Sequence, residues 1–279
     1  MKKRAVNFMV VILMLALVVQ IFFGEKLASV FEHLGGEKGK VVVLDSGHGG
    51  DDPGKIGIND AKEKDINLAI TLKLREYLEA EGITVVMTRE ADESLHREGA
   101  SNKKRDDMNR RVEIIEDAKP DLTVSIHQNS YPDGSVCGPQ VFYYKGSEAG
   151  EKAALLLQDH LNADLEIARP RAAKENNDYY LLKKSSGAMV IAECGFLSNY
   201  EEAQKLITEG YQDQVAKAVC AGILEYLDMD GTKTETGQSV QENNSIDHRE
   251  TDTYESESRE TWISEPESLK PAASQEDME

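Results

Sequence analysis

The sequence predicts a single α/β domain with a mainly parallel, twisted sheet flanked by helices, preceded by an N-terminal membrane helix. Short β-branched runs such as Lys40–Asp45 alternate with longer segments of helical spacing such as Asp65–Glu81. Strands separated by helices favour a parallel sheet that is covered on both faces. An almost uninterrupted apolar run, from about Val6 to Phe23, predicts the membrane helix. The 279 residues allow one stable core with appendages at both ends.

The individual elements follow from the spacing of apolar residues. In the first helical segment, Ile66, Ile70 and Leu74 recur at the interval that places them on one helix face. Runs rich in β-branched and aromatic residues predict strands. Strands are expected at Lys40–Asp45, Ile83–Met87, Asp121–His127, Gln140–Tyr144, around Tyr179–Leu182 and at Ala188–Glu193. Helices are expected at Asp65–Glu81, Arg105–Lys119, Glu148–Ala163 and Gln212–Leu227, with a loop over Arg89–Lys104.

The N-terminal apolar run is long enough to cross a membrane. Its 18 residues, interrupted only by Asn7 and Gln20, just span a bilayer core as a helix. Basic residues at positions 2–4 favour a cytoplasmic start, so the rest of the chain is expected on the extracytoplasmic side of the cell membrane. The alternative is secretion after signal cleavage, for which the sequence around Ala28 is a poor site.

Composition divides the chain into four segments. The basic start and anchor occupy residues 1–24, a linker 25–39, the folded domain 40–228 and a tail 229–279. From Asp230 to Glu279 there are 14 acidic and 4 basic residues with few large apolar groups, which predicts an acidic, disordered tail. The net charge of −19, without a basic stripe, argues against nucleic acid as a partner.

Ionisable residues lie at or just past the ends of three apolar runs that are far apart in the chain. His48 follows VVVLDSG, His127 ends the run before QNS, and Glu193 follows VIA. Because the carboxyl ends of parallel strands converge on one crevice, these residues can share a site with Glu63 of AKEKDINLAI. Two imidazoles and a carboxylate suit catalytic zinc, and a second carboxylate can take a proton from the bound water. The pattern predicts a zinc hydrolase.

Each of these residues also has a structural interpretation. His48 lies in a glycine-rich turn, but the turn lacks the known phosphate-binding patterns. His127 alone could be a hydrogen-bonded strand end, and its pairing with His48 favours a ligand. Glu63 stands at a charged helix start, where a carboxylate also suits the helix dipole, so chemistry alone favours the structural interpretation there. Glu193 is flanked by apolar residues and needs a cation, a metal or a cleft, because an unpaired buried charge is costly.

Other titratable residues have less definite roles. Arg111 could contact Glu193 or a substrate carboxylate, but the adjacent Arg110 leaves the choice between the two arginines open. The remaining histidines lie in polar contexts and are expected to be solvated; they are His33, His96, His160 and His248. The cysteines are odd in number and lack a metal-binding spacing, so we expect buried structural thiols at Cys137, Cys194 and Cys220.

Taken in order, these segments resemble the zinc-dependent N-acetylmuramoyl-L-alanine amidases of the Amidase_3 type. The resemblance rests on DSGHGGDDPGKIG, EKDINLAI, TRE, the helix near Arg111, SIHQNS and ECGFLSNYEE. It covers residues 40–228, which it implies are a zinc amidase catalytic domain. It implies zinc ligands at His48, Glu63 and His127, and a catalytic carboxylate at Glu193.

The resemblance implies hydrolysis of the amide bond between N-acetylmuramic acid and L-alanine in peptidoglycan. Size, an N-terminal anchor and the absence of a wall-binding repeat are similar to the sporulation (cortex) amidases of this family, which implies spore cortex maturation and muramic δ-lactam formation. The implied partners are peptidoglycan and, through the N-terminal helix, the membrane; an activating protein is not identified by the sequence. Gln128 and Ser130 stand where many relatives have alanines, and Gly187 where a proline is common, which leaves substrate preference open.

Two other functions could use the same residues. A zinc peptidase acting on the stem peptide would need the same constellation, although the H-E-x-x-H pattern is absent. A non-catalytic, membrane-tethered module that binds peptidoglycan or regulates another protein would tolerate the loss of zinc or of Glu193. The presence of all four residues argues against this second alternative.

Overall fold

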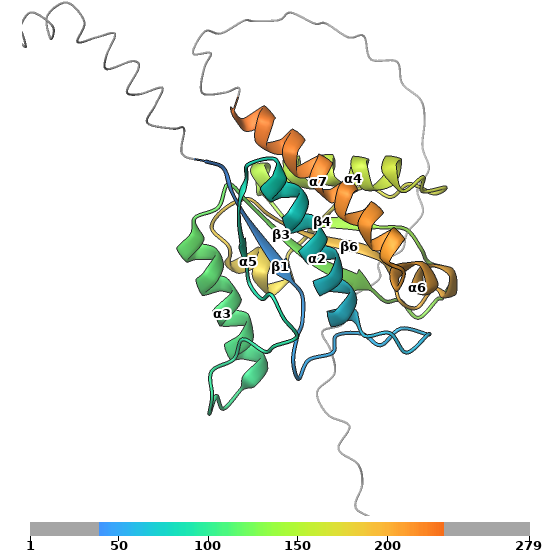
Figure 1. The fold of residues 1–279 in the computed structure, drawn as a ribbon, viewed down its shortest axis with the longest axis horizontal. Helices are drawn as coiled ribbons and strands as arrows, with labels where there is room; N and C mark the ends of the chain where they lie inside the picture. The colour runs from blue at the N-terminus through green and yellow to red at the C-terminus, as the bar shows by residue number, and fades with distance from the viewer. Residues whose placement is uncertain (1–38, 232–279) are drawn as a thin grey trace, which may run out of the picture. The chain divides into compact units, whose positions relative to one another are not determined.

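The strands of the molecule form one six-stranded sheet, which the computed structural model describes within residues 39–231 (Figure 1). Its order is β2-β1-β3-β6-β4-β5. The strands are β1 (Val41–Ser46), β2 (Thr84–Met87), β3 (Leu122–Asn129), β4 (Gln140–Tyr144), β5 (Lys174–Asn176) and β6 (Met189–Phe196). The helices are α2 (Glu63–Ala80), α3 (Lys103–Ala118), α4 (Glu148–Asp164), α5 (Tyr180–Lys184), α6 (Tyr200–Leu206) and α7 (Glu209–Gly231).

The sheet is mainly parallel, as the sequence predicts. Strands β2, β1, β3 and β6 run in one direction, β4 is antiparallel to β6, and β5 is parallel to β4. The reversal at β4 has a local cause, because only residues 130–139 connect β3 to it. A connection of that length is shorter than the crossover, usually helical, that joins parallel strands.

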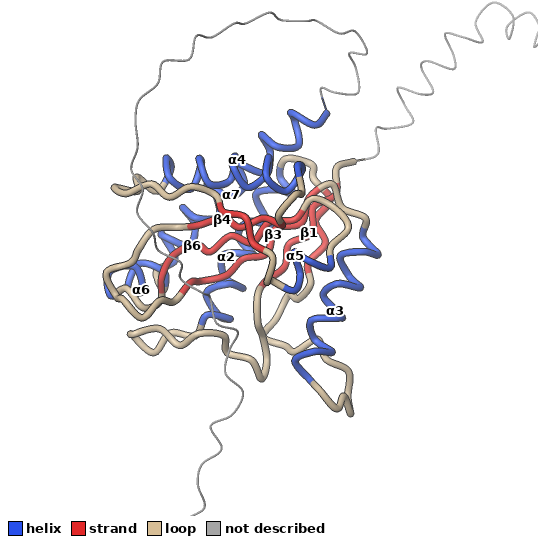
Figure 2. Tube along the Cα trace, turned by 180° about the vertical axis from the view of Figure 1, so that it is seen from behind, coloured by secondary structure: helices blue, strands red, loops and turns tan. Residues whose placement is uncertain are grey.

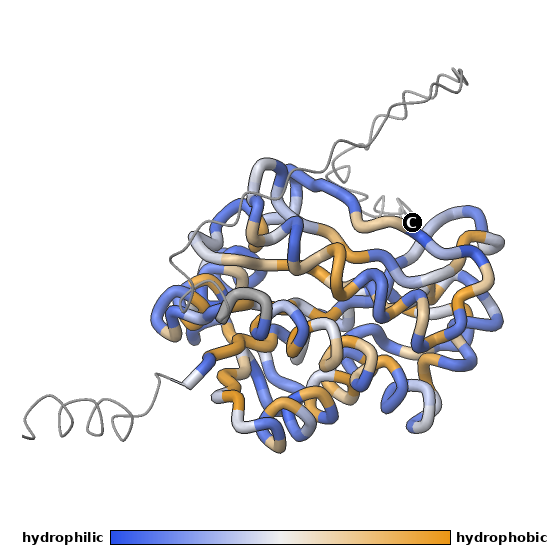
Figure 3. The backbone as a smooth tube through the Cα atoms, turned by 90° about the horizontal axis from the view of Figure 1, so that it is seen from above, coloured by the Kyte–Doolittle hydropathy of each residue, from blue (hydrophilic) through white to orange (hydrophobic). Residues whose placement is uncertain are grey.

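Helices cover both faces of the sheet, as Figures 1 and 2 show. Helices α2, α4 and α7 pack over one face around a large apolar core that includes Leu44, Val124 and Ile223. Helices α3 and α5 cover the other face, where the smaller core includes Val43 and Ile115. Figure 3 shows hydrophobic stretches through the middle of the domain with hydrophilic segments around them. The expected single α/β domain with a helix-flanked sheet is confirmed for these residues.

The expected strand around Tyr179–Leu182 is wrong. These residues begin α5, and the edge strand of this region is instead the short β5. Tyrosine and leucine fit a half-buried strand by propensity. Adjacent residues of a strand point to opposite faces of the sheet, however, whereas Leu181 and Leu182 are both buried in the smaller core, as a helical turn allows. Helix α6 is also present where no element was expected.

No helix within residues 39–231 is long and apolar enough to cross a membrane. The expected anchor at residues 1–24 lies outside the described residues, as do most of the expected linker and tail. Their interpretation therefore stays a prediction.

Candidate metal centre

The carboxyl ends of three parallel strands bring the four predicted residues together. His127 on β3 and Glu193 on β6 are register partners on adjacent strands. His48 follows the end of β1 by two residues, and Glu63 is the first residue of α2. The structure therefore brings these four residues together at one edge of the sheet, as the sequence predicts.

The carboxylate of Glu63 lies between two imidazoles. Its Oε2 is 3.2 Å from Nε2 of His48, and its Oε1 is 2.9 Å from Nδ1 of His127. One ligand atom from each of the three residues lies within 4.8 Å of the others, an arrangement that could hold a metal ion. Glu63 itself is buried, with 2% of its side chain exposed.

The backbone around this group leaves no room for side chains at two glycines. A Cβ atom on Gly47 would lie 2.4 Å from the ring of His127. A Cβ atom on Gly54, whose φ is +67°, would lie 2.6 Å from Oε2 of Glu63. A buried carboxylate between two nitrogen ligands also needs a positive charge beside it. The donor set and its cradle therefore fit a divalent metal ion.

Electrostatics in this cluster favour a cation at its centre. Burial disfavours the charged imidazole, but hydrogen bonds to Asp52 and Glu63 raise the pKa of His48 to about 9. Burial likewise opposes ionisation of Glu63, but His127 and His48 hold its pKa well below the usual range. The field that attracts a proton to the imidazole also attracts a metal ion, which binds by displacing that proton.

Neighbouring groups orient two of the three side chains, those of His48 and Glu63. The imidazole of His48 hydrogen-bonds through Nδ1 to Oδ2 of Asp52 at 2.8 Å, which leaves Nε2 toward Glu63. Backbone N–H groups of Lys55 and Gln128 donate to the two oxygens of Glu63 at 2.8 and 3.1 Å. Such partners fix the rotamers and the ionised state that a metal ligand needs.

Glu193 lies beside this group and is incompletely paired. Its Oε1 accepts a hydrogen bond from the Tyr179 hydroxyl at 3.3 Å, whereas its buried Oε2 has no hydrogen-bond partner. Burial, together with the nearby Glu63 carboxylate, raises the pKa of Glu193 to about 7 against the opposing effect of His127. A carboxyl group with a pKa near neutrality can both accept and return a proton.

Two contacts differ from the sequence expectations. Arg111 does not contact Glu193: its buried guanidinium donates to Asp45 and Asp107, because its side chain points from α3 toward β1. The contact of Tyr179 with Glu193 was not expected, because Tyr179 was assigned to a strand. The adjacent Arg110 forms an ion pair with Glu113 on the same helix.

Within the described residues, the other histidines and the cysteines lie outside the cluster. Nε2 of His160 lies 2.8 Å from Glu225, and Nε2 of His96 lies 3.7 Å from Asp51, so both imidazoles lie beside acidic side chains rather than simply in solvent. His33 and His248 are outside the described residues. The thiols are free; Cys194 and Cys220 are buried as expected, and Cys137 is half-buried.

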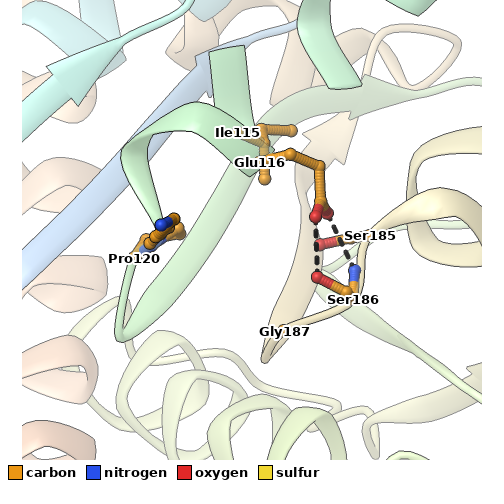
Figure 4. A pocket seen from close by; sticks show the side chains of 7 residues that line it. Ile115, Glu116, Pro120, Ser185, Ser186 and Gly187 are labelled. Carbon is orange, nitrogen blue, oxygen red and sulfur yellow. Dashed lines mark hydrogen bonds between the residues drawn. The ribbon is translucent and has the colours of Figure 1, made fainter. Parts of the chain in front are cut away.

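A cavity of about 370 Å³ lies at the opposite end of the sheet, between the end of α3 and the segment that enters β6 (Figure 4). Within it, the Glu116 carboxylate accepts hydrogen bonds from the backbone N–H of Ser186 at 3.0 Å and from its hydroxyl at 2.8 Å. The lining also includes Ile115 and Pro120. The Glu116 carboxylate is thus hydrogen-bonded, and the lining includes none of the four residues brought together at the other end of the sheet.

Comparison with known proteins shows which family model the sequence matches. The family model Amidase_3, described as N-acetylmuramoyl-L-alanine amidase, matches residues 42–225. The chain is 39% identical over 200 residues to the germination-specific N-acetylmuramoyl-L-alanine amidase of Bacillus subtilis (strain 168). That alignment covers 71% of this chain and 84% of the relative.

Solved structures agree with the sequence comparison. The CwlD amidase from Clostridioides difficile, in complex with the GerS lipoprotein, is 40% identical, with a TM-score of 0.67 over 68% of this chain and 100% of that one. The catalytic domain of CwlV, an N-acetylmuramoyl-L-alanine amidase from Bacillus (Paenibacillus) polymyxa var. colistinus, is 31% identical. Its TM-score is 0.60, over 68% of this chain and 98% of that one.

Proposed function

The chain belongs to the Amidase_3 family of N-acetylmuramoyl-L-alanine amidases, and from this premise we propose that it hydrolyses the amide bond between N-acetylmuramic acid and L-alanine in peptidoglycan. One observation carries the proposal: an incompletely paired carboxylate, Glu193, lies beside a group of two imidazoles and a carboxylate that could hold a metal ion. Metal-assisted amide hydrolysis needs both parts.

We propose that the metal ion is zinc, held by His48, Glu63 and His127. Two histidines and one glutamate are a common ligand set for catalytic zinc, and three protein ligands leave a position for water or substrate. When bound, zinc would polarise the scissile carbonyl and make a neighbouring water more acidic. Because Glu63 supplies a single negative charge, the zinc site would keep a net positive charge, which both of these effects require.

Glu193 would carry the proton during the reaction. Its carboxylate accepts a proton from the attacking water and later donates it to the leaving amine of L-alanine. The hydrogen bond from Tyr179 fixes Oε1, which leaves Oε2 free to exchange the proton. Because the group is buried, its pKa is about 7, so it can perform both transfers near neutral pH.

The biological setting is proposed from the relatives. Similarity to a germination-specific amidase and to the CwlD amidase supports our proposal of a role in spore cortex maturation and muramic δ-lactam formation. We propose that the apolar run at residues 6–23 anchors the domain outside the cytoplasm, or is cleaved on secretion. That the CwlD amidase was solved with a lipoprotein supports the proposal of an extracytoplasmic protein partner.

Product analysis tests the reaction. Zinc-loaded full-length protein and its Glu193→Gln variant are each incubated with purified peptidoglycan, and the soluble products are identified by mass spectrometry. We expect the parent alone to release stem peptides that begin with L-alanine and to leave peptide-free muramic acid. Cleavage within the stem peptide would show a peptidase instead, and intact muropeptides from both proteins would contradict an autonomous amidase.

A further inference from the structure

Two buried arginines border the loop that carries His48, and the mechanism above uses neither of them. Arg89 follows β2 and Arg111 lies on α3, and both residues are 2% exposed. Buried guanidinium groups usually pair with carboxylates, because leaving a buried charge unpaired is costly. Here most of the hydrogen bonds go instead to backbone carbonyl oxygens in the two segments that carry His48 and Glu63.

Arg111 holds the end of β1 and the loop residue His48 together. Its guanidinium donates to the carbonyl oxygen of Ser46 at 2.8 Å and to that of His48 at 2.6 Å. The guanidinium is itself fixed by Asp45 at 2.6 Å and by Asp107 at 2.8 Å.

Arg89 joins the same loop to the start of α2. It donates to the carbonyl oxygens of Ser46 at 3.0 Å and Gly47 at 3.1 Å. A third bond, of 2.8 Å, goes to the carbonyl oxygen of Lys64, the residue after Glu63. One guanidinium therefore ties the backbone beside His48 to the backbone beside Glu63.

The conformation of His48 explains why the loop needs this support. Its φ is 60°, in the left-handed region that a residue with a Cβ atom seldom adopts. Such conformations persist where surrounding contacts enforce them, and they concentrate at functional sites. The carbonyl oxygen that Arg111 binds belongs to this strained residue.

We propose that Arg89 and Arg111 are positioning residues that set the affinity of the site for its metal ion, by holding His48 in its left-handed conformation and in register with Glu63. The inference rests on the proposed function in one respect, namely that His48 and Glu63 are zinc ligands. Removing partners that orient metal ligands weakens metal binding by about 10-fold to 100-fold. The same range is expected here.

Zinc titration against a chromophoric chelator tests the proposal on full-length, metal-free protein. The variants are Arg111→Lys and Arg89→Lys, in which the charge remains but one ammonium group cannot reproduce the planar fork. Arg110→Lys is the matched control, because Arg110 is adjacent on α3 and pairs with Glu113 instead. We expect zinc dissociation constants about 10-fold to 100-fold higher for the first two variants, and an unchanged constant for the control.

A purely structural role for these arginines predicts a different pattern. In that case the melting temperature of the metal-free protein falls while zinc affinity stays at the parental value, and this result would overturn the proposal. Recovery of the parental kcat at saturating zinc supports it, since the ligands and Glu193 are all retained in these variants.

A milder substitution keeps the test decisive if the arginine variants do not fold. Asp107→Asn weakens the support of Arg111 at Nε and leaves its carbonyl contacts in place. We expect a smaller but measurable loss of zinc affinity, and parental affinity in this variant would contradict the proposal. A parent protein that binds no zinc contradicts the proposed function, whereas a parent that binds zinc with unaffected variants contradicts only this inference.

Discussion

The two ends of the central sheet differ in how their charged groups are satisfied. At the amino end, the Glu116 carboxylate accepts two hydrogen bonds from Ser186 beside a cavity of about 370 Å³ (Figure 4). At the carboxyl end, His48 has a left-handed backbone and Glu193 keeps one buried oxygen without a partner. A buried carboxylate oxygen without a hydrogen-bond partner, rather than the volume of a cavity, marks the end of the sheet where chemistry is expected.

The largest expected effect comes from the carboxylate that lacks a partner. Glu193→Gln removes the group that accepts and returns the proton while keeping the shape of the side chain. We expect kcat to fall by about 100-fold to 10,000-fold, the usual range for loss of a general acid-base group. Zinc content, measured by elemental analysis, should stay at the parental value. Parental turnover by this variant would show that Glu193 is not the group that transfers the proton.

The tight packing at the carboxyl end gives the next largest effect. Gly47→Ala places a methyl group 2.4 Å from the ring of His127, so this ring must move. Zinc affinity in the chelator competition should fall by about 10-fold to 100-fold, as for other changes that displace a ligand. Gly210→Ala is the control, because a Cβ atom there meets no atom within 4 Å. If both alanine variants bind zinc equally well, the close approach has no part in metal binding.

An unsatisfied carboxylate should also make the molecule less stable. The pKa of Glu193 is raised to about 7 in the fold, from an ordinary value of 4.5, so the folded state binds the proton more tightly than the unfolded state. Stability is therefore lost as pH rises from about 4.5 to 7, by about 3 kcal/mol. Glu193→Gln removes this loss.

Thermal unfolding of the metal-free proteins measures the effect. The melting temperature of Glu193→Gln relative to the parent should increase between pH 4.5 and 7 and then remain constant. A variant that melts below the parent at pH 8 would show instead that the ionised Glu193 stabilises the fold.

Sequence alone predicts the parts of this site that depend on topology. The ends of apolar runs locate His48, His127 and Glu193, because parallel strands bring their carboxyl ends together. Glu63 is different: a carboxylate at a helix start has a sufficient structural explanation, and only the resemblance to a family implies that it is a ligand.

The residues that surround the site are harder to predict from sequence. Arg89 begins a polar stretch that is expected to be a loop, and no local pattern shows that its side chain is buried. Tyr179 reaches Glu193 from the residue before α5, where tyrosines and leucines also suit a strand. Both contacts depend on tertiary packing between segments distant in sequence.

A smaller effect is expected from the one hydrogen bond that Glu193 receives. Tyr179→Phe removes the hydroxyl that favours the ionised carboxylate, so the pKa of Glu193 should rise further. The acidic limb of the kcat profile should then move to higher pH, with activity at pH 7 reduced by roughly 2-fold to 5-fold for a shift of about half to one pKa unit. Tyr180→Phe is the matched control, because its hydroxyl donates to Asn109 instead. Identical pH profiles for the two variants would show that the Tyr179 contact does not affect proton transfer.

The smallest effect is expected at the satisfied end of the sheet. Glu116→Gln keeps one oxygen that can accept from Ser186, replaces the other with an NH2 group and removes the charge of an exposed side chain. Unfolding free energy should change by less than about 1 kcal/mol, as is usual for exposed hydrogen bonds and surface substitutions. Turnover and zinc affinity should equal the parental values, because this carboxylate lies at the opposite end of the strands from Glu193. A variant that stays folded but loses turnover would break the distinction between the two ends, and it would assign the cavity beside Glu116 a role in the reaction.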